Sequence, residues 1–199
     1  MPIVIGNDTI SGLGVNGLPA GSVTNTNLAS AAVTSTALGA GFTLQTVVDI
    51  KTGRIAGSSS FSYSTSALSG VTGSKFLEVA NFTPLFATSL IWIQVFTSQT
   101  SETSNHSNNL GHGIWKNNTG APLNIAYISP RFNDYDLGGV NHTHELTISY
   151  IEVAGSTSAR TYSWYAGADG GAVCINGVGA NNVWGGQGMS IMTVMEIKQ

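Results

Sequence analysis

The amino-acid sequence predicts an all-β fold, an antiparallel β-sandwich with a jelly-roll-like arrangement of strands. Charged residues make up only 9% of the 199, and the polarity comes from Ser, Thr and Asn together with 25 glycines. This mixture is poor for helices, because Ser, Thr and Asn side chains hydrogen-bond the backbone and Gly loses much entropy on ordering. Apolar residues still make up 42%, which is enough to fill a core. Short apolar or alternating runs recur between turn signals, as in a sandwich.

Strands are predicted wherever apolar residues alternate with polar ones or form a short continuous run. The segment 90–96 is apolar on both faces for most of its length, so it is predicted to be a central strand of the core. The segment 142–153 alternates, with Leu146 and Ile148 on one face. Turn signals at 168–171 and 176–177 favour tight hairpins. The predicted strands are 44–50, 76–82, 90–96, 114–116, 124–128, 142–153, 160–166, 172–175 and 189–197.

Residues 1–42 differ from the rest and are predicted to be an extended anchor segment used in assembly. Apolar residues there stand singly between Gly, Pro and polar residues, so the segment cannot form a core of its own. It becomes ordered only by lying along another surface, and the alternative is a flexible tail. The residues predicted to make that contact are Ile10, Leu13, Leu18, Pro19 and Val23. Residues 43–199 are predicted to form the β-sandwich domain.

The charge balance argues against two classes of partner. A net charge of −3 with seven Lys+Arg gives no electrostatic footprint for nucleic acid and no basic patch for a membrane. No stretch approaches the roughly 20 apolar residues of a membrane helix, so no membrane insertion is expected. The start of the chain has no basic, apolar signal segment, so synthesis in a cytoplasm is expected. The single Cys174 excludes an intrachain disulfide and a cysteine zinc site.

Short motifs at both ends and in the middle of the chain point to one protein family. The opening contains ISGL at 10–13 and GLPAGSV at 17–23. The middle contains LQTVV at 44–48, FTP at 82–84 and SLIWI at 89–93. The last part contains STSARTY at 156–162 and MTVMEI at 192–197. Together these motifs resemble a leader segment and the small β-domain that follows it in structural proteins of marine bacteriophages, especially cyanophages.

The resemblance implies a virion protein of the tail-fibre-like or head-decoration kind, and phage fibres are typically homotrimers. It implies partners within the particle, which are other copies of the chain and a capsid, collar or tail protein. The family pattern often has a basic residue where this sequence has Leu90, and residues 100–145 match no part of it. We expect partner specificity to vary in that middle stretch.

A binding site for a host-surface glycan is predicted around residues 132–138. Trp115 and Tyr135 would stack on a sugar ring, and the carboxylates of Asp134 and Asp136 would accept hydrogen bonds from its hydroxyls. The two aspartates are also candidate Ca²⁺ ligands, although the spacing lacks the remaining oxygen ligands of an EF-hand. The third alternative is an ordinary Asx-rich turn.

His142 and His144 form a candidate metal site. On a strand their side chains point to one face, about 7 Å apart. One interpretation is a strand end with two exposed or hydrogen-bonded histidines. The other places them on the axis of a trimer, where six imidazoles would bind a first-row transition metal. No other cofactor is expected.

The sequence predicts no catalytic residues and therefore no enzyme. It contains no Gly-x-Ser-x-Gly motif, and Cys174 lies in an apolar run without a basic neighbour. The predicted function is that of a trimeric phage fibre, spike or decoration protein, made in the host cytoplasm and located on the virion. The alternatives are a carbohydrate-binding module and a polysaccharide depolymerase with paired carboxylates.

Overall fold

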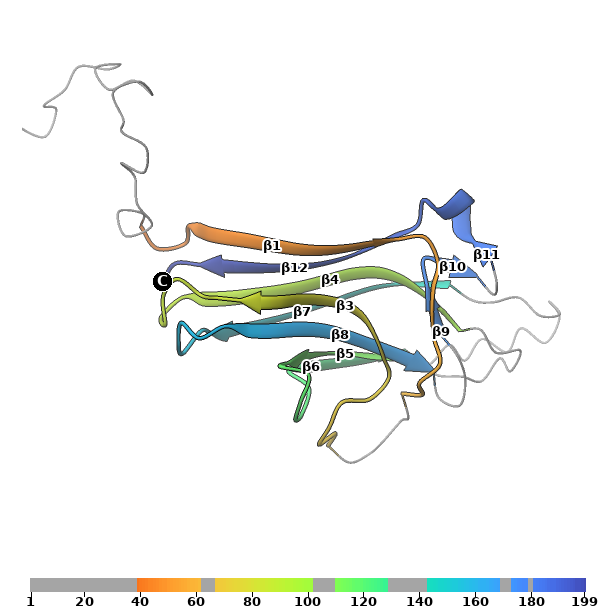
Figure 1. Ribbon diagram of the computed structural model, residues 1–199, viewed down its shortest axis with the longest axis horizontal. Helices are drawn as coiled ribbons and strands as arrows, with labels where there is room; N and C mark the ends of the chain where they lie inside the picture. Colours follow the sequence, from red (N-terminus) through yellow and green to blue (C-terminus); the bar gives the residue numbers. More distant parts are fainter. Residues whose placement is uncertain (1–38, 62–66, 102–109, 129–142, 169–172, 179–180) are drawn as a thin grey trace, which may run out of the picture. The chain divides into compact units, whose positions relative to one another are not determined.

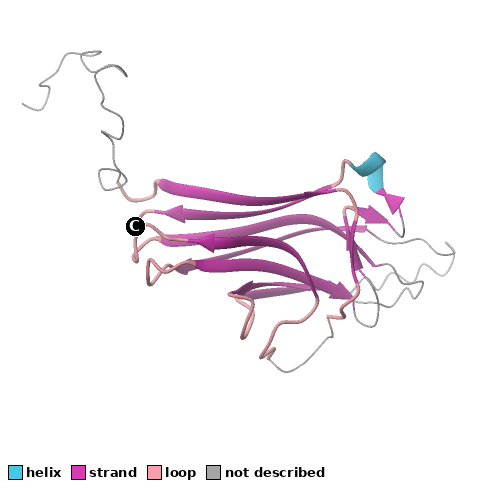
Figure 2. Ribbon diagram, in the orientation of Figure 1, coloured by secondary structure: helices cyan, strands magenta, loops and turns pink. Residues whose placement is uncertain are grey.

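The computed structural model describes residues 39–61, 67–101, 110–128, 143–168, 173–178 and 181–199. In these residues the chain forms antiparallel sheets, with one short 3-10 helix (Figure 1, Figure 2). The all-β prediction is therefore confirmed. Residues 39–199 form one compact unit, and the predicted anchor segment lies outside the described residues apart from 39–42. No helix in the described part of the chain is long and apolar enough to cross a membrane.

The strands form two main sheets and one small ribbon. Sheet A has the order β1-β12-β4-β9-β2, with β7 paired to the other side of β4, and sheet B has the order β3-β8-β5-β6. A separate ribbon consists of β10 and β11. The elements are β1 Thr43–Thr52, β2 Ile55–Gly57, β3 Ser74–Phe82, β4 Leu90–Ser101, β5 Leu110–Lys116, β6 Asn124–Ile128, β7 Thr143–Val153, β8 Arg160–Ala168, β9 Val173–Ile175, β10 Gly177–Val178, β11 Asn181–Asn182, η1 Val183–Gly186 and β12 Met189–Ile197.

The main strands pair in nested fashion, which identifies the jelly roll. The first pairs with the last, β1 with β12, and inside this pair lie β3 with β8, β4 with β7, and β5 with β6. Two further pairs, β12 with β4 and β8 with β5, join them into two four-stranded sheets. This arrangement of antiparallel strands in two packed sheets is the jelly-roll order.

Strand β4 is central in sheet A, as predicted, but it is buried on one face only. Ile91, Ile93 and Val95 point into the core between the sheets and have no exposed surface. On the opposite face Trp92 is only half-buried and Phe96 is 42% exposed. The predicted central strand of the core is therefore present, and no other layer of the described chain covers its second face.

The outer face of sheet B is covered by the chain itself. The segments 57–61 and 67–73 lie over it, held by hydrogen bonds from the Phe61 N–H to the Ala168 carbonyl (3.2 Å) and from the Gly73 N–H to the Ser60 carbonyl (3.2 Å). The Phe61 ring fits there because Gly111 has no side chain: a Cβ at Gly111 would overlap the Phe61 ring. Within the described residues, sheets A and B therefore differ, since sheet B has a second cover and sheet A has none.

Candidate interaction surface

The pairing register of sheet A places four adjacent rows, fifteen side chains in all, on its outward side, and Ser98, Glu145, Thr52 and Met189 follow in the next row. Because side chains alternate between faces, the residues opposite outward positions of β4 also point outward. Trp92 lies opposite Ile151 of β7 and Met195 of β12, and Met195 lies opposite Thr46 of β1. We call the whole set the outer face: Thr46, Val48 and Ile50; Ile191, Thr193, Met195 and Ile197; Leu90, Trp92, Gln94 and Phe96; Thr147, Ser149, Ile151 and Val153.

The outer face contains no charged side chain, and ten of its fifteen residues are apolar. Several large apolar side chains on it are strongly exposed: Val48 47%, Ile50 47%, Phe96 42%, Ile151 55% and Val153 54%. Soluble monomers rarely expose large contiguous apolar patches, and such patches mark interaction sites. The outer face is therefore the candidate interaction surface of the protein.

Strand geometry gives the size of the outer face. Four strands about 4.8 Å apart make it about 19 Å wide, and four outward rows about 6.8 Å apart make it about 27 Å long. The flat area is about 500 Å², at the upper end of the patches seen on monomers. The accessible area is larger because side chains project from the sheet, which brings it towards the ~800 Å² that each partner of a stable complex contributes.

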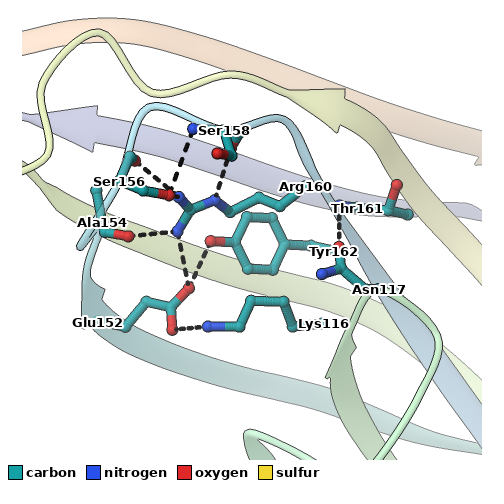
Figure 3. Close-up of polar contacts among 9 residues, drawn as sticks. All are labelled: Lys116, Asn117, Glu152, Ala154, Ser156, Ser158, Arg160, Thr161 and Tyr162. Atoms are coloured by element: carbon teal, nitrogen blue, oxygen red, sulfur yellow. Dashed lines mark hydrogen bonds and ion pairs between the residues drawn. The ribbon is translucent and has the colours of Figure 1, made fainter.

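A polar cluster lies where the loop 154–159 joins β7 to β8 (Figure 3). Glu152 accepts hydrogen bonds from Lys116 Nζ and Tyr162 Oη, both at 2.6 Å, and lies 3.8 Å from Arg160 Nη1. Burial, followed by the hydrogen bond to Glu152, raises the pKa of Tyr162. The guanidinium of Arg160 also donates to the carbonyls of Ala154 (2.6 Å), Ser156 (2.8 Å) and Ser158 (3.3 Å).

A pocket of about 250 Å³ adjoins this cluster. Its lining includes Lys116, Asn117, Ser156 and Arg160. Each of the three guanidinium nitrogens of Arg160 already has an acceptor within the protein, and Lys116 is paired with Glu152. The arrangement holds the loop in place, and its cations are occupied by groups of the protein.

Two other titratable groups, His112 and Glu78, are held by the fold. His112 is buried and accepts a hydrogen bond at Nδ1 from Trp164 Nε1 (3.1 Å), and burial lowers its pKa to about 4. Hydrogen bonds from Lys75, Asn118 and Ser163 lower the pKa of Glu78 to about 2. Among the described residues, no group of three or more His, Cys, Asp or Glu side chains could hold a metal ion.

Glu196 is a buried carboxylate at the end of β12. Burial alone would raise its pKa, but hydrogen bonds from the Leu85 N–H, the Gln45 amide and the Phe86 N–H outweigh burial and keep the pKa below its usual value. The Leu85 N–H donates at 2.9 Å and Gln45 Nε2 at 2.6 Å. This carboxylate therefore fixes the loop between β3 and β4.

The structure overturns one predicted binding residue. Trp115 is fully buried, in edge contact with Phe61 (centroids 6.1 Å apart) and Tyr165 (5.2 Å). Its Nε1 donates to the Gly120 carbonyl at 3.2 Å. The prediction that Trp115 stacks on a glycan is wrong, because the segment containing Phe61 covers its ring.

Most of the other predicted site residues lie outside the described structure. Asp134, Tyr135, Asp136 and His142 lie outside the described residues, as do the anchor residues Ile10, Leu13, Leu18, Pro19 and Val23. The backbone of His144 lies in β7 opposite Gln99 of β4.

Sequence reasoning missed the outer face, although its signal was present. The segment 90–96 is apolar at both alternating sets of positions, and Val48 with Ile50, and Ile151 with Val153, repeat this on the neighbouring strands. Such a pattern predicts burial on both faces of a sheet. It does not say whether the second cover belongs to the same chain or to another molecule.

Comparisons with known proteins identify no family. No protein-family model matches the chain. No curated protein matches it either. Among solved structures, the crystal structure of dimeric latent PorU from Porphyromonas gingivalis is similar to it at a TM-score of 0.36 and 12% sequence identity. That similarity covers 75% of this chain and 13% of the PorU chain, so this chain spans a small part of the PorU length.

Proposed function

We propose that this chain is a structural subunit of a bacteriophage virion, a trimeric fibre, spike or decoration protein. The observation that carries the proposal is the exposed, uncharged outer face of sheet A. A protein that works alone in solution keeps such surface charged, whereas a subunit of an assembly buries it. The placement on a phage particle is supported by the sequence motifs at 10–23, 44–48, 82–93, 156–162 and 192–197.

In this proposal the two parts of the chain have separate tasks. Residues 1–42 attach to a capsid, collar or tail protein, and the sandwich projects from the particle. The jelly roll agrees with such a role, since capsid domains and lectins use it, although a fold alone does not set a function. Attachment to a host-surface glycan would use Asp134, Tyr135 and Asp136 without Trp115.

The proposal assigns the chain no catalytic activity. A carbohydrate-binding module is the second candidate from another class. Of the two aromatic side chains predicted to stack on a glycan, Trp115 is buried. A polysaccharide depolymerase predicts release of reducing ends from host glycans, which a reducing-sugar assay measures directly.

Imaging of labelled particles tests the proposal. Particles are purified from lysate of the strain that carries the coding sequence, and gold-conjugated antibody against residues 43–199 is added. We expect label at repeated, symmetry-related positions on the capsid, collar or tail. Particles that contain no trace of the chain by mass spectrometry would overturn the virion role.

A further inference from the structure

We infer that the outer face of β1, β12, β4 and β7 packs against the same face of other copies of this chain, around a three-fold axis that runs along the strands. This inference rests on the proposed function, because it gives the trimer proposed there its contact surface. The partner is thus a second and third copy of the chain, and the particle protein is contacted elsewhere.

The absence of charge on the outer face favours a copy of itself as the occupant. None of its fifteen residues is charged, and Glu145 follows only beyond the end of the face, opposite Ser98. A nucleic acid, an acidic glycan or an anionic membrane requires cationic groups at the contact. An uncharged face offers no such groups, but it matches an identical uncharged face without leaving a buried charge unpaired.

The exposed side chains are apolar where a partner would contact them. Ile151 and Val153 on one side of the face and Val48 and Ile50 on the other are each about half exposed. Burying apolar surface contributes about 25 cal/mol per Å². By contrast, the outer face of sheet B is already covered by the segment containing Phe61. In the part of the chain that the structure describes, sheet A is therefore the layer that lacks a cover.

The dimensions of the face fit three copies. Three faces, each about 19 Å wide, close into a triangular prism whose walls lie about 5.5 Å from the central axis. Two sheets that pack face to face are about 10 Å apart, so each lies about 5 Å from the plane between them. The two distances agree, so side chains from the three faces fill the space around the axis without a channel.

A row that is polar at three of its four positions crosses the outer face and sets its register. Ser149, Gln94, Thr193 and Val48 lie opposite one another across the four strands. Gln94 and Thr193 are on the two middle strands, which lie nearest the axis in the prism. Buried polar groups need hydrogen-bond partners, and the Gln94 amide both donates and accepts. The copies therefore align with their Gln94 rows at one level.

Charge insertion tests the inference in the full chain. Val48→Lys and Ile151→Lys each place an ammonium on the outer face, and the control Ile125→Lys places one on an equally exposed residue (48%) of β6 in sheet B. Light scattering at micromolar concentration measures the mass in solution. For the wild type and the control we expect about three times the 20.6 kDa of one chain, and for the two outer-face variants we expect the mass of a single chain. A monomeric or dimeric wild type, or trimeric face variants, would overturn the inference.

A second measurement covers the case in which a lysine variant does not fold. Ser149→Cys is nearly isosteric on the outer face, and Ser158→Cys lies in the exposed loop after β7. The native Cys174 is fully buried and gives little background. Reaction with a bulky maleimide is expected to be at least tenfold slower at Ser149→Cys. Equal rates would overturn the inference, whereas the imaging of particles decides the virion role separately.

Discussion

Phe61 shows how a single close contact decides which residues of sheet B are accessible. Its ring lies against Gly111 and over Trp115, so the missing side chain at Gly111 is what allows the cover to form. We expect Gly111→Ala to lower the free energy of unfolding by about 1–3 kcal/mol, because the added methyl displaces the ring. Urea unfolding measures the change. Gly70→Ala is the control, since a Cβ there meets no atom within 4 Å, and a similar loss in both variants would contradict the argument.

The position of Trp115 could have been anticipated from its neighbours. In the pattern Gly111-His112-Gly113-Ile114-Trp115, the two glycines share a face with the tryptophan. Small residues beside a large aromatic one indicate that something packs closely over that face. The identity of the cover could not be predicted, because Phe61 is distant in sequence and carries no local signal for the contact.

His112 makes stability depend on pH. The imidazole is neutral in the folded protein, with a pKa lowered by burial from 6.5 to about 4. Unfolded chains therefore bind more protons between these two values, and the free energy of unfolding falls as pH falls. The expected loss is about 3 kcal/mol from pH 6.5 to 4, at about 1.36 kcal/mol per pH unit.

Chemical unfolding at a series of pH values measures how the free energy of unfolding depends on pH, and the variant His112→Gln is the comparison. The wild type should lose stability mainly between pH 6.5 and 4, and the variant should show a flatter profile there. The carboxylate of Glu78, with its pKa lowered from 4.5 to about 2, adds a separate loss below pH 4.5. A wild-type profile that is flat from pH 6.5 to 4.5 would contradict the argument.

At the scale of elements, the turn between β7 and β8 depends on one side chain. Arg160 holds the carbonyls of Ala154, Ser156 and Ser158 and lies beside Glu152. We expect Arg160→Met to lower the free energy of unfolding by about 3–5 kcal/mol, since it leaves the carbonyls of Ala154, Ser156 and Ser158 without their donor and removes a cation from beside the Glu152 carboxylate. Thermal or urea unfolding measures this change in the free energy of unfolding. As a control, Lys51→Met breaks the exposed ion pair with Asp49 and should lower the free energy of unfolding by less than about 1 kcal/mol. An equal loss in the two variants would contradict the role of Arg160 in holding the turn.

The long strands were predictable because their side chains carry the period of a sheet. The predicted 189–197 coincides with β12, in which buried and half-buried residues alternate. Strand β5 was predicted only from 114, because Gly111 and Gly113 give no strand propensity, and its start is imposed by pairing with β8. Strand β2 has three residues and forms by pairing with β9, far along the chain. The residues around β2 therefore could not predict this pairing.

At the scale of the molecule, residues 39–199 form a compact unit without the segment that precedes them. We expect deletion of residues 1–40 to leave a folded domain, because β1 begins only at Thr43 and its pairing with β12 is kept. The same deletion is expected to abolish incorporation into particles, since it removes the proposed anchor. Circular dichroism and mass spectrometry of purified particles measure the two effects. An unfolded product, or normal incorporation, would contradict the division of tasks.

The chemistry of the outer face also predicts how the trimer responds to salt. The face has no charged side chain, so screening by salt has no ionic attraction to weaken. Apolar burial is strengthened by sulfate, which is excluded from protein surfaces. We expect the dissociation constant of the trimer to stay constant between about 0.05 and 1 M NaCl, where the Debye length falls to about 3 Å. In ammonium sulfate it should decrease. Sedimentation equilibrium measures both, and a tenfold weakening in NaCl would show that charged residues outside the outer face make the contact.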